Sequence, residues 1–295
     1  MDKDTIKRLI IEYQQFVANI TLIEREIHLS HQLNYVFVGL RRAGKSYLMY
    51  QQIQSLLNDG HQPEEILYFN FEDDRLVNLT VEDLDLIKVS YEELYPHKPI
   101  FFLDEIQIVE HWEKFARRLA DQQYRVYITG SNAKMLSAEI ATTLGGRYIV
   151  QNVYPFSFSE FLKASKIEIG PTWYYKNRTE IVRTFSDYFS YGGLPELMLI
   201  ETIEKRQWLS NLFNKIFFGD LITRYSIRND LAMKVLIRKL AESVKQPSSF
   251  NRLTNIVSTT GAKVSTDTII DYLNFLQATW LFFSLENYAS KLVEK

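Results

Sequence analysis

The sequence of 295 residues lacks cysteine, which excludes disulfides, thiolate-bound zinc, iron–sulfur clusters and a cysteine nucleophile. Its five histidines are scattered and match neither H-x-x-x-H nor H-E-x-x-H, so we expect no histidine-based metal site. No run of 18 apolar residues is present, and acidic residues interrupt the N-terminus where a signal peptide would be apolar. We therefore expect a cytoplasmic protein that does not enter a membrane.

The balance of charged and apolar residues is that of an ordinary folded protein. Apolar residues make up 46% of the chain, enough for a buried core, and the length predicts two domains or three small ones. The 34 basic and 36 acidic residues give a net charge of −2. The overall charge therefore does not point to nucleic acid, although it leaves room for a local basic face.

Short apolar runs alternate with helical periodicity in the first half of the sequence. Helical spacing of apolar residues covers 5–30 and 45–57. Apolar strands separated by helices are typical of an α/β fold with a parallel sheet. The predicted strands are residues 35–38, 66–71, 100–103, 124–129 and 148–153.

Residues 39–46, GLRRAGKS, fit the phosphate-loop pattern G-x-x-x-x-G-K-[ST] at every fixed position. The two glycines let backbone N–H groups turn inward toward phosphate oxygens, and the helix that begins here adds the positive end of its dipole. Lys45 would lie between the outer phosphates and Ser46 would offer its hydroxyl to Mg²⁺. For Arg42, an orientation toward solvent is an equal alternative. The predicted nucleotide contacts are Gly39, Arg42, Ala43, Gly44, Lys45, Ser46 and Tyr47.

Two carboxylates, Asp104 and Glu105, follow the apolar run 100–103. In open α/β sheets the carboxyl ends of the strands face the ligand. We expect Asp104 to hold Mg²⁺, directly or through water, and Glu105 to polarise the attacking water. The next strand ends near Ser131 and Asn132, where a polar side chain could contact a γ-phosphate or orient the attacking water. A simple Gly-Ser-Asn turn explains that segment equally well.

Six segments occur in an order that resembles a widespread group of prokaryotic AAA+-like ATPases, related to the archaeal-type ATPases and the signal-transducing STAND NTPases. The resemblance covers most of the chain from about residue 30. It implies an ASCE-type P-loop sheet, with an extra strand between the Walker A and Walker B strands. The segments are GLRRAGKS at 39–46, LDEIQ at 103–107, TGSN at 129–132, LGGRY at 144–148, PFSFSEF at 155–161 and GGLPE at 192–196.

The resemblance also implies roles for individual residues. Asp104 and Glu105 match the magnesium and catalytic carboxylates, and Ser131 and Asn132 match the sensor 1 position. Arg147 stands just before the fifth strand, where AAA+ proteins carry an arginine finger that reaches a neighbouring subunit.

Pro195 resembles the proline that packs on adenine in STAND proteins. The alternatives are a plain surface arginine at 147 and a helix-breaking turn at 195.

Beyond Pro155 the pattern becomes helical. Near the C-terminus it runs helix (251–258), glycine turn (260–262), helix (265–277) and strand-like apolar run (280–283), which suits a winged helix. The start of the second of these helices is polar and slightly acidic, so a protein-contact or lid-stabilising role is favoured over DNA binding. The expected parts are an N-terminal helix packed on the core at 1–30, a P-loop ATPase core at 31–155, an α-helical lid at 156–245 and a winged-helix-like module at 246–295.

Members of the group usually continue into a domain that resembles restriction endonucleases, and this sequence stops at Lys295, where such a domain would begin. Either the sequence is part of a longer protein or this member lacks the domain. No nuclease activity is therefore assigned to the residues present.

The predicted function is Mg²⁺-dependent ATP binding and hydrolysis coupled to conformational change, in a homo-oligomer. ATP is favoured over GTP because the guanine-binding pattern [NT]-K-x-D is missing. One alternative is a slow-turnover switch that holds ATP or ADP and presents its C-terminal module to a protein partner. Another is an ATPase that handles DNA, which rests on family association alone.

Overall fold

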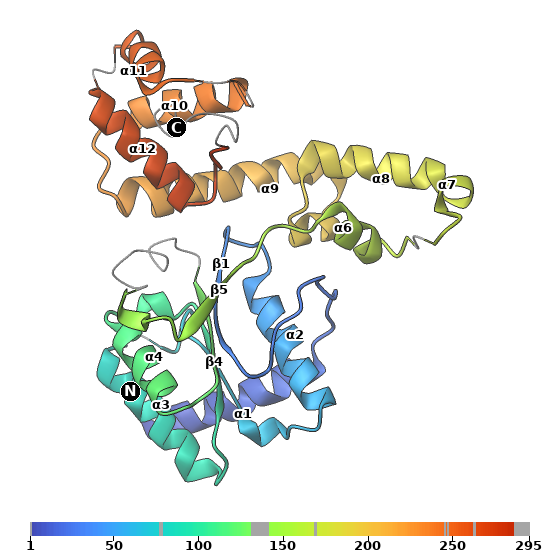
Figure 1. The fold of residues 1–295 in the computed structure, drawn as a ribbon, viewed down its shortest axis with the longest axis vertical. Coiled ribbons are helices and arrows are strands. Elements are labelled where there is room, and N and C mark those ends of the chain that lie inside the picture. Colours follow the sequence, from blue (N-terminus) through green and yellow to red (C-terminus); the bar gives the residue numbers. More distant parts are fainter. Residues whose placement is uncertain are drawn as a thin grey trace. The chain divides into compact units, whose positions relative to one another are not determined.

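The computed structural model describes residues 2–76, 79–130, 142–167, 170–244, 246, 248–261 and 264–285 (Figure 1). The chain forms two compact units, Met1–Arg206 and Gln207–Lys295. Within the described residues, we find no helix that is both long and apolar enough to cross a bilayer.

A five-stranded parallel sheet forms the centre of the first unit, with the strand order β2-β3-β4-β1-β5. β4 therefore lies between β1, which leads into the phosphate loop, and β3, which ends in Asp104. This is the inserted strand that the resemblance implied, so that expectation is confirmed. The strands are β1 (Asn34–Val38), β2 (Ile66–Asn70), β3 (Ile100–Asp104), β4 (Val126–Gly130) and β5 (Tyr148–Asn152).

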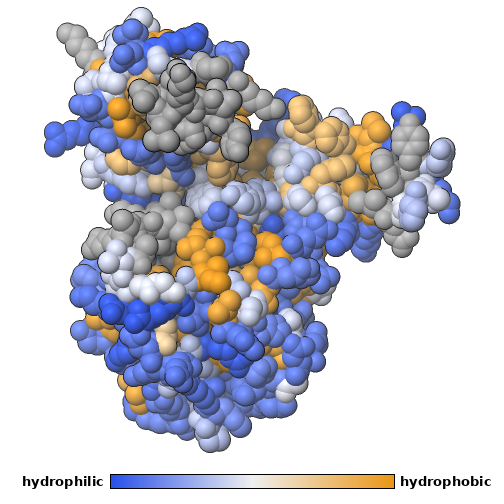
Figure 2. Space-filling model, viewed as in Figure 1, coloured by the Kyte–Doolittle hydropathy of each residue, from blue (hydrophilic) through white to orange (hydrophobic). Residues whose placement is uncertain are grey.

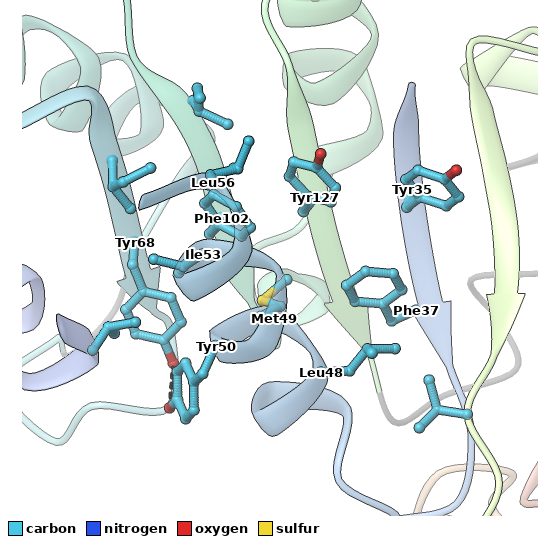
Figure 3. Close-up of a cluster of buried hydrophobic side chains, with 14 of the residues drawn as sticks. Tyr35, Phe37, Leu48, Met49, Tyr50, Ile53, Leu56, Tyr68, Phe102 and Tyr127 are labelled. Carbon is cyan, nitrogen blue, oxygen red and sulfur yellow. Dashed lines mark hydrogen bonds between the residues drawn. The ribbon is translucent and has the colours of Figure 1, made fainter. Parts of the chain in front are cut away.

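Helices cover both faces of the sheet. On one face, aromatic side chains of β1, β3 and β4 stack under α2 (Lys45–Asn58), as Figure 3 shows. The rings of Phe102 and Tyr127 lie 4.5 Å apart and nearly parallel, and Tyr35 continues the row at 6.0 Å from Tyr127. On the other face, Phe101 meets Phe115 of α4 (Trp112–Asp121). Alternation of side chains along each strand produces these two apolar layers. Further elements are α3 (Val81–Leu94) and the short 3-10 turns η1 (Pro63–Glu65) and η2 (Ile106–Ile108).

The N-terminal helix α1 (Lys3–Asn19) is shorter than the sequence indicated. The side chain of Asp2 caps it by accepting the N–H of Thr5, and it ends before Ile20. Residues 20–30 are not helical, so the predicted helix over 5–30 is wrong in its second half. β-Branched residues are frequent just after Asn19 and disfavour helix, and apolar residues of this stretch pack on the core instead.

Beyond β5 the described chain is helical, as predicted. In the first unit, α8 exposes an apolar side, because Val182, Phe185 and Phe189 are 60%, 49% and 81% exposed. Figure 2 shows hydrophobic surface along this helix. The elements here are α6 (Phe158–Ala164), α7 (Trp173–Lys176), α8 (Arg178–Tyr191), the 3-10 turn η4 (Pro195–Leu199) and α9 (Thr202–Lys215), which runs on into the second unit.

The second unit has its own apolar core, to which residues of one π-helix and three α-helices contribute. The predicted helices near 251–258 and 265–277 are confirmed within one residue, but the predicted strand-like run at 280–283 is wrong. Trp280 takes a left-handed conformation and its N–H bonds to Gln277, which ends α12 in a turn. The elements are the π-helix η5 (Ile216–Thr223), α10 (Asp230–Glu242), α11 (Phe250–Ser258) and α12 (Thr266–Ala278).

Gly39 is needed where β1 leaves the sheet, because a Cβ there would lie 2.1 Å from the carbonyl oxygen of Val153. Gly39→Ala should lower the free energy of unfolding by about 1–3 kcal/mol, since backbone must shift to make room. Gly170→Ala is the matched control in the same unit, because no described atom lies within 4 Å of its Cβ position. Urea unfolding of both variants measures the difference. A Gly39→Ala variant as stable as the parent would contradict this close approach.

Candidate functional site

The carboxyl ends of three neighbouring strands meet at one edge of the sheet. The phosphate loop, residues 39–46, follows β1, Asp104 ends β3, and Thr129 lies at the end of β4. Parallel pairing sets Val38 beside Gly130 and Leu103 beside Ile128, so these exits are adjacent in space. The phosphate loop and the two carboxylates picked out in the sequence are therefore brought together.

The phosphate loop is held in a tight, partly left-handed conformation. Arg42 and Gly44 have φ angles of 65° and 94°, and the N–H of Ala43 bonds to the carbonyl of Leu40. Gly44 is the N-cap of α2. The first amide groups of a helix have no acceptor within the helix, so the loop leads directly into a set of N–H donors suited to an anion.

Lys45 is buried at the centre of the site, with 4% of its surface exposed. Its Nζ donates to the carbonyl oxygens of Gly39 (3.4 Å) and Leu40 (3.2 Å) and lies 3.8 Å from Oε1 of Glu105. Burial lowers the pKa of the Lys45 ammonium, and the carboxylates of Glu105 and Asp104 offset only part of that effect. The Lys45 side chain is thus held beside the carboxylates of Asp104 and Glu105.

Asp104 is fully buried and its carboxylate is surrounded by hydroxyl groups. The hydroxyl of Tyr68 donates to Oδ2 at 2.7 Å, and that of Thr129 donates to Oδ1. Burial raises the pKa of Asp104, while the hydrogen bonds from Thr129, Tyr68 and Ser46 act in the opposite direction. The hydroxyl of Ser46 and the carboxylate of Asp104 therefore lie together, as the sequence predicted for a shared ligand.

Glu105 follows in a left-handed conformation, with φ 55°. Its N–H donates to the hydroxyl oxygen of Thr129 at 2.8 Å, and its Oε2 accepts from the side chain of Gln107. A non-glycine residue in this region costs on the order of 1–2 kcal/mol, so its surroundings must hold it there. Thr129 does so by bridging the two consecutive acids.

Sequence reasoning missed Thr129 and Tyr68. Thr129 belongs to the TGSN segment, but the polar residues after it were favoured as nucleotide contacts. The alternation of side chains along the strand could have identified Thr129. It lies two residues after Tyr127, so both face α2. Tyr68 lies on β2, and its hydroxyl also lies 3.0 Å from that of Tyr50. A tyrosine within a buried strand gave no hint of which carboxylate it would meet.

Two predicted site residues cannot be described, and the side chains of two others have the following surroundings. Ser131 and Asn132 fall outside the described residues. The side chain of Tyr47 is 52% exposed on α2. Arg42 forms an ion pair with Glu196.

Pro195, at the start of η4, lies beside the loop. Its Cγ is 3.8 Å from the Cβ position of Gly44.

Arg147 lies at the amino end of the strands, opposite the end that carries the phosphate loop. It precedes Tyr148, which pairs with Asn34 at the amino end of β1, whereas the phosphate loop follows the carboxyl end. Its side chain is 33% exposed, forms an ion pair with Asp121 of α4 and donates to the carbonyl of Gly145. Within one chain Arg147 is therefore separated from the site by the length of a strand.

The donor set fits Mg²⁺ better than a transition metal. Ser46 and Asp104 offer only oxygen atoms, and among the described residues there is no group of three or more His, Asp or Glu side chains that could form a cage. Mg²⁺ commonly uses one or two carboxylates, with phosphates and waters completing its shell.

Comparison with known proteins agrees with this geometry. Residues 31–162 match the family model described as an AAA domain, and residues 182–295 match a domain of unknown function (DUF8612). Uncharacterized protein MJ1544 of Methanocaldococcus jannaschii is 32% identical over 98% of this chain and 65% of its own length. An uncharacterized protein of Haemophilus influenzae is 32% identical over 90% of this chain and 67% of its own length. The chain thus spans about two thirds of these relatives.

Solved structures show only distant similarity. AMPPCP-bound DnaA from Aquifex aeolicus has a TM-score of 0.34 at 14% identity, covering 92% of this chain and 87% of that one. Cdc6p from Pyrobaculum aerophilum has a TM-score of 0.33 at 14% identity, covering 93% and 85%. Similarity at this level says nothing about activity.

The family match and the two relatives, together with the phosphate loop beside paired carboxylates, lead to one conclusion: the chain belongs to a family of AAA+-like P-loop ATPases in which the AAA domain is followed by a domain of unknown function.

Proposed function

We propose that the chain binds ATP with Mg²⁺ at the carboxyl edge of its sheet and hydrolyses it in the cytoplasm, coupling turnover to conformational change in a homo-oligomer. The observation that carries this proposal is the convergence of four side chains. Nζ of Lys45 lies 3.8 Å from Glu105, and the hydroxyl of Ser46 contacts Asp104. A phosphate chain on the loop would thus meet a cation, metal ligands and a base at once.

The phosphate loop would bind through backbone amides and one charge. The amides of residues 39–47 hold the phosphate oxygens, and Lys45 neutralises the outer phosphates. Ser46 and Asp104 would hold Mg²⁺, which when bound neutralises phosphate charge. Arg42 would add a contact once it separates from Glu196, and Pro195 would pack on adenine.

Glu105 would act as the general base. One of its carboxylate oxygens accepts a proton from the attacking water, while Gln107 orients the carboxylate and Thr129 fixes the backbone beneath it. Ser131 and Asn132 are proposed to contact the γ-phosphate.

Arg147 would complete the site of a neighbouring copy. Its distance from the loop of its own chain and its partial exposure support action in trans, after release from Asp121. An arginine donated between subunits stabilises the charge of the transition state.

The helical parts would transmit the nucleotide state. We propose 156–245 as the lid and 246–295 as a winged-helix-like module, whose helices α11 and α12 share one core with α10 of the lid. The exposed apolar side of α8 supports a contact with a protein partner. DNA binding has less support, because α12 begins with Thr266 and Asp267, which provide no cation for a phosphate backbone.

A slow-turnover switch is the second candidate. It is favoured by the ion pair between Arg42 and Glu196, which ties the loop to the segment that carries Pro195. In this case ATP or ADP would stay bound and determine whether the C-terminal module is presented to a partner.

Replacing Lys45 and Glu105 separates binding from chemistry. Lys45→Ala should weaken ATP binding by about tenfold or more, because a charged hydrogen-bond donor is lost. Glu105→Gln should bind ATP normally and turn over about 10²–10⁴-fold more slowly. Glu92→Gln on α3 is the matched control and should change neither, because its exposed carboxylate pairs with Lys88 of the same helix. Equilibrium binding and phosphate release are the measurements, and full turnover by Glu105→Gln would remove Glu105 from its role.

ATP turnover per chain should rise with protein concentration if the site is completed between copies. Arg147→Ala should then lower turnover roughly 10³-fold or more. Arg117→Ala is the control, because Arg117 contacts the same Asp121. Mixing the Arg147→Ala and Lys45→Ala chains should recover activity, since each supplies what the other lacks. Turnover independent of concentration, with no recovery on mixing, contradicts action in trans.

Thr129→Val should lower both stability and turnover, because the N–H of Glu105 loses its acceptor and Asp104 loses a donor. The expected destabilisation is about 1–3 kcal/mol. Thr129→Ser retains the hydroxyl and should stay close to the parent. Chemical unfolding and kcat of both variants are the readouts, and equal behaviour of the two would show that the hydroxyl does not matter.

A further inference from the structure

We propose that Arg25 is a positioning residue of the phosphate loop, which fixes the peptide between Ala43 and Gly44 so that its N–H points toward the bound phosphates. This inference rests on the proposed function. It concerns a residue outside every motif of the sequence, in the non-helical stretch that follows α1.

One buried guanidinium joins three separate segments. The side chain of Arg25 is 5% exposed, its Nη1 donates to the carbonyl of Ala43 at 3.0 Å, and its Nη2 donates to that of Tyr154 at 2.8 Å. Its Nε donates to Oε1 of Glu160 at 2.7 Å, and its Cζ lies 5.0 Å from the ring centre of Phe156. The planar fork of arginine suits such a site, because it donates in several fixed directions at once.

The backbone of Arg25 is anchored to the helix that the phosphate loop begins. Its N–H donates to Oε1 of Gln51 at 2.7 Å, and Nε2 of Gln51 donates to its carbonyl at 3.2 Å. Gln51 lies on α2, two turns from the loop. The backbone of Arg25 is therefore fixed on α2, and its guanidinium reaches from there to Ala43 in the loop before this helix.

Glu160 balances the buried charge. Besides Arg25, its carboxylate accepts the N–H groups of Glu26 (2.9 Å) and Ser157 (2.8 Å). Burial alone would raise the pKa of Glu160, but the hydrogen bonds from Arg25 and these amides outweigh it and hold the pKa below its usual value. Glu160 is thus ionised at neutral pH, and its carboxylate is bound by Arg25 and by two backbone N–H groups.

The geometry of the peptide bond connects Arg25 to phosphate. In a planar trans peptide the C=O and the following N–H point in opposite directions. A donor fixed on the oxygen of Ala43 therefore turns the N–H of Gly44 away from Arg25, toward the inside of the loop. A cation on the oxygen also polarises the peptide and strengthens its N–H as a donor. Arg25 acts through this peptide and does not itself touch the nucleotide.

Gly44 lies beside the guanidinium in a left-handed conformation that favours glycine. Gly44 has φ 94°, and a Cβ there would lie 3.4 Å from Nη1 of Arg25. The guanidinium packs against the outside of the turn whose inside would receive the phosphates.

Two variants test the role. Arg25→Lys retains the charge but cannot form the three-way fork. The double variant R25M/E160Q removes both charges together and keeps an amide oxygen as acceptor for a backbone N–H, so the buried site is not left with a single ion. Glu26→Gln is the matched control: its exposed carboxylate contacts Ser159 and Lys163, so it links the same stretch to the same helix α6 without touching the loop.

The readouts are the Kd values of ADP and inorganic tripolyphosphate, and the KM and kcat of ATP hydrolysis, measured well below the melting temperature of each variant. Arg25→Lys and the double variant should weaken both ligands about tenfold and raise KM by a similar factor, with kcat changed less than about threefold. Glu26→Gln should stay within about twofold of the parent.

A purely structural anchor predicts lower melting temperatures with unchanged phosphate affinity of the folded protein, and that result would overturn the inference while leaving the proposed function intact. A parent chain that binds neither ADP nor tripolyphosphate would overturn the proposed function and this inference with it.

Discussion

The buried carboxylate of Asp104 is the constraint that organises the site. A charge removed from water must recover its hydrogen bonds from the protein, and here hydroxyl groups of Tyr68, Thr129 and Ser46 provide them. These donors come from β2, from β4 and from the first turn of α2, so they meet only if β3 lies between β2 and β4. The strand order therefore determines whether the buried carboxylate of Asp104 can receive these hydrogen bonds.

One of these hydroxyl groups, that of Tyr68, belongs to the aromatic layer beneath α2. Burial raises the pKa of Tyr68 well above its usual value, so its hydroxyl stays protonated and remains a donor to Asp104. Tyr127, further along this layer, accepts from the side chain of Gln52 on α2. The rings of this layer thus form apolar contacts, and the hydroxyl groups of Tyr68 and Tyr127 form hydrogen bonds. It fixes α2 against the sheet, and with it the loop from which α2 begins.

The sequence predicted what is local and missed what depends on the order of strands. The five strands, the phosphate loop and the pair Asp104–Glu105 each follow from contiguous residues, and the structure contains them. Tyr68, Thr129 and Arg25 were missed because each meets partners that are far apart in the chain. Strand order and side-chain alternation set the positions of Tyr68 and Thr129, and Arg25 lies in an irregular stretch with no periodicity to read. The errors in secondary structure occur where tertiary packing overrides periodicity, after Asn19 and around Trp280.

The contact between Gly39 and Val153 has a mechanical consequence. Backbone touches backbone there: the N–H of Val153 donates to the carbonyl of Val38 at 2.7 Å, and Gly39 leaves no side chain between them. A side chain can absorb a small displacement by changing rotamer, whereas two peptide planes in contact cannot. A displacement of the chain as it leaves β5 is therefore passed directly to the backbone of Gly39, the first residue of the phosphate loop.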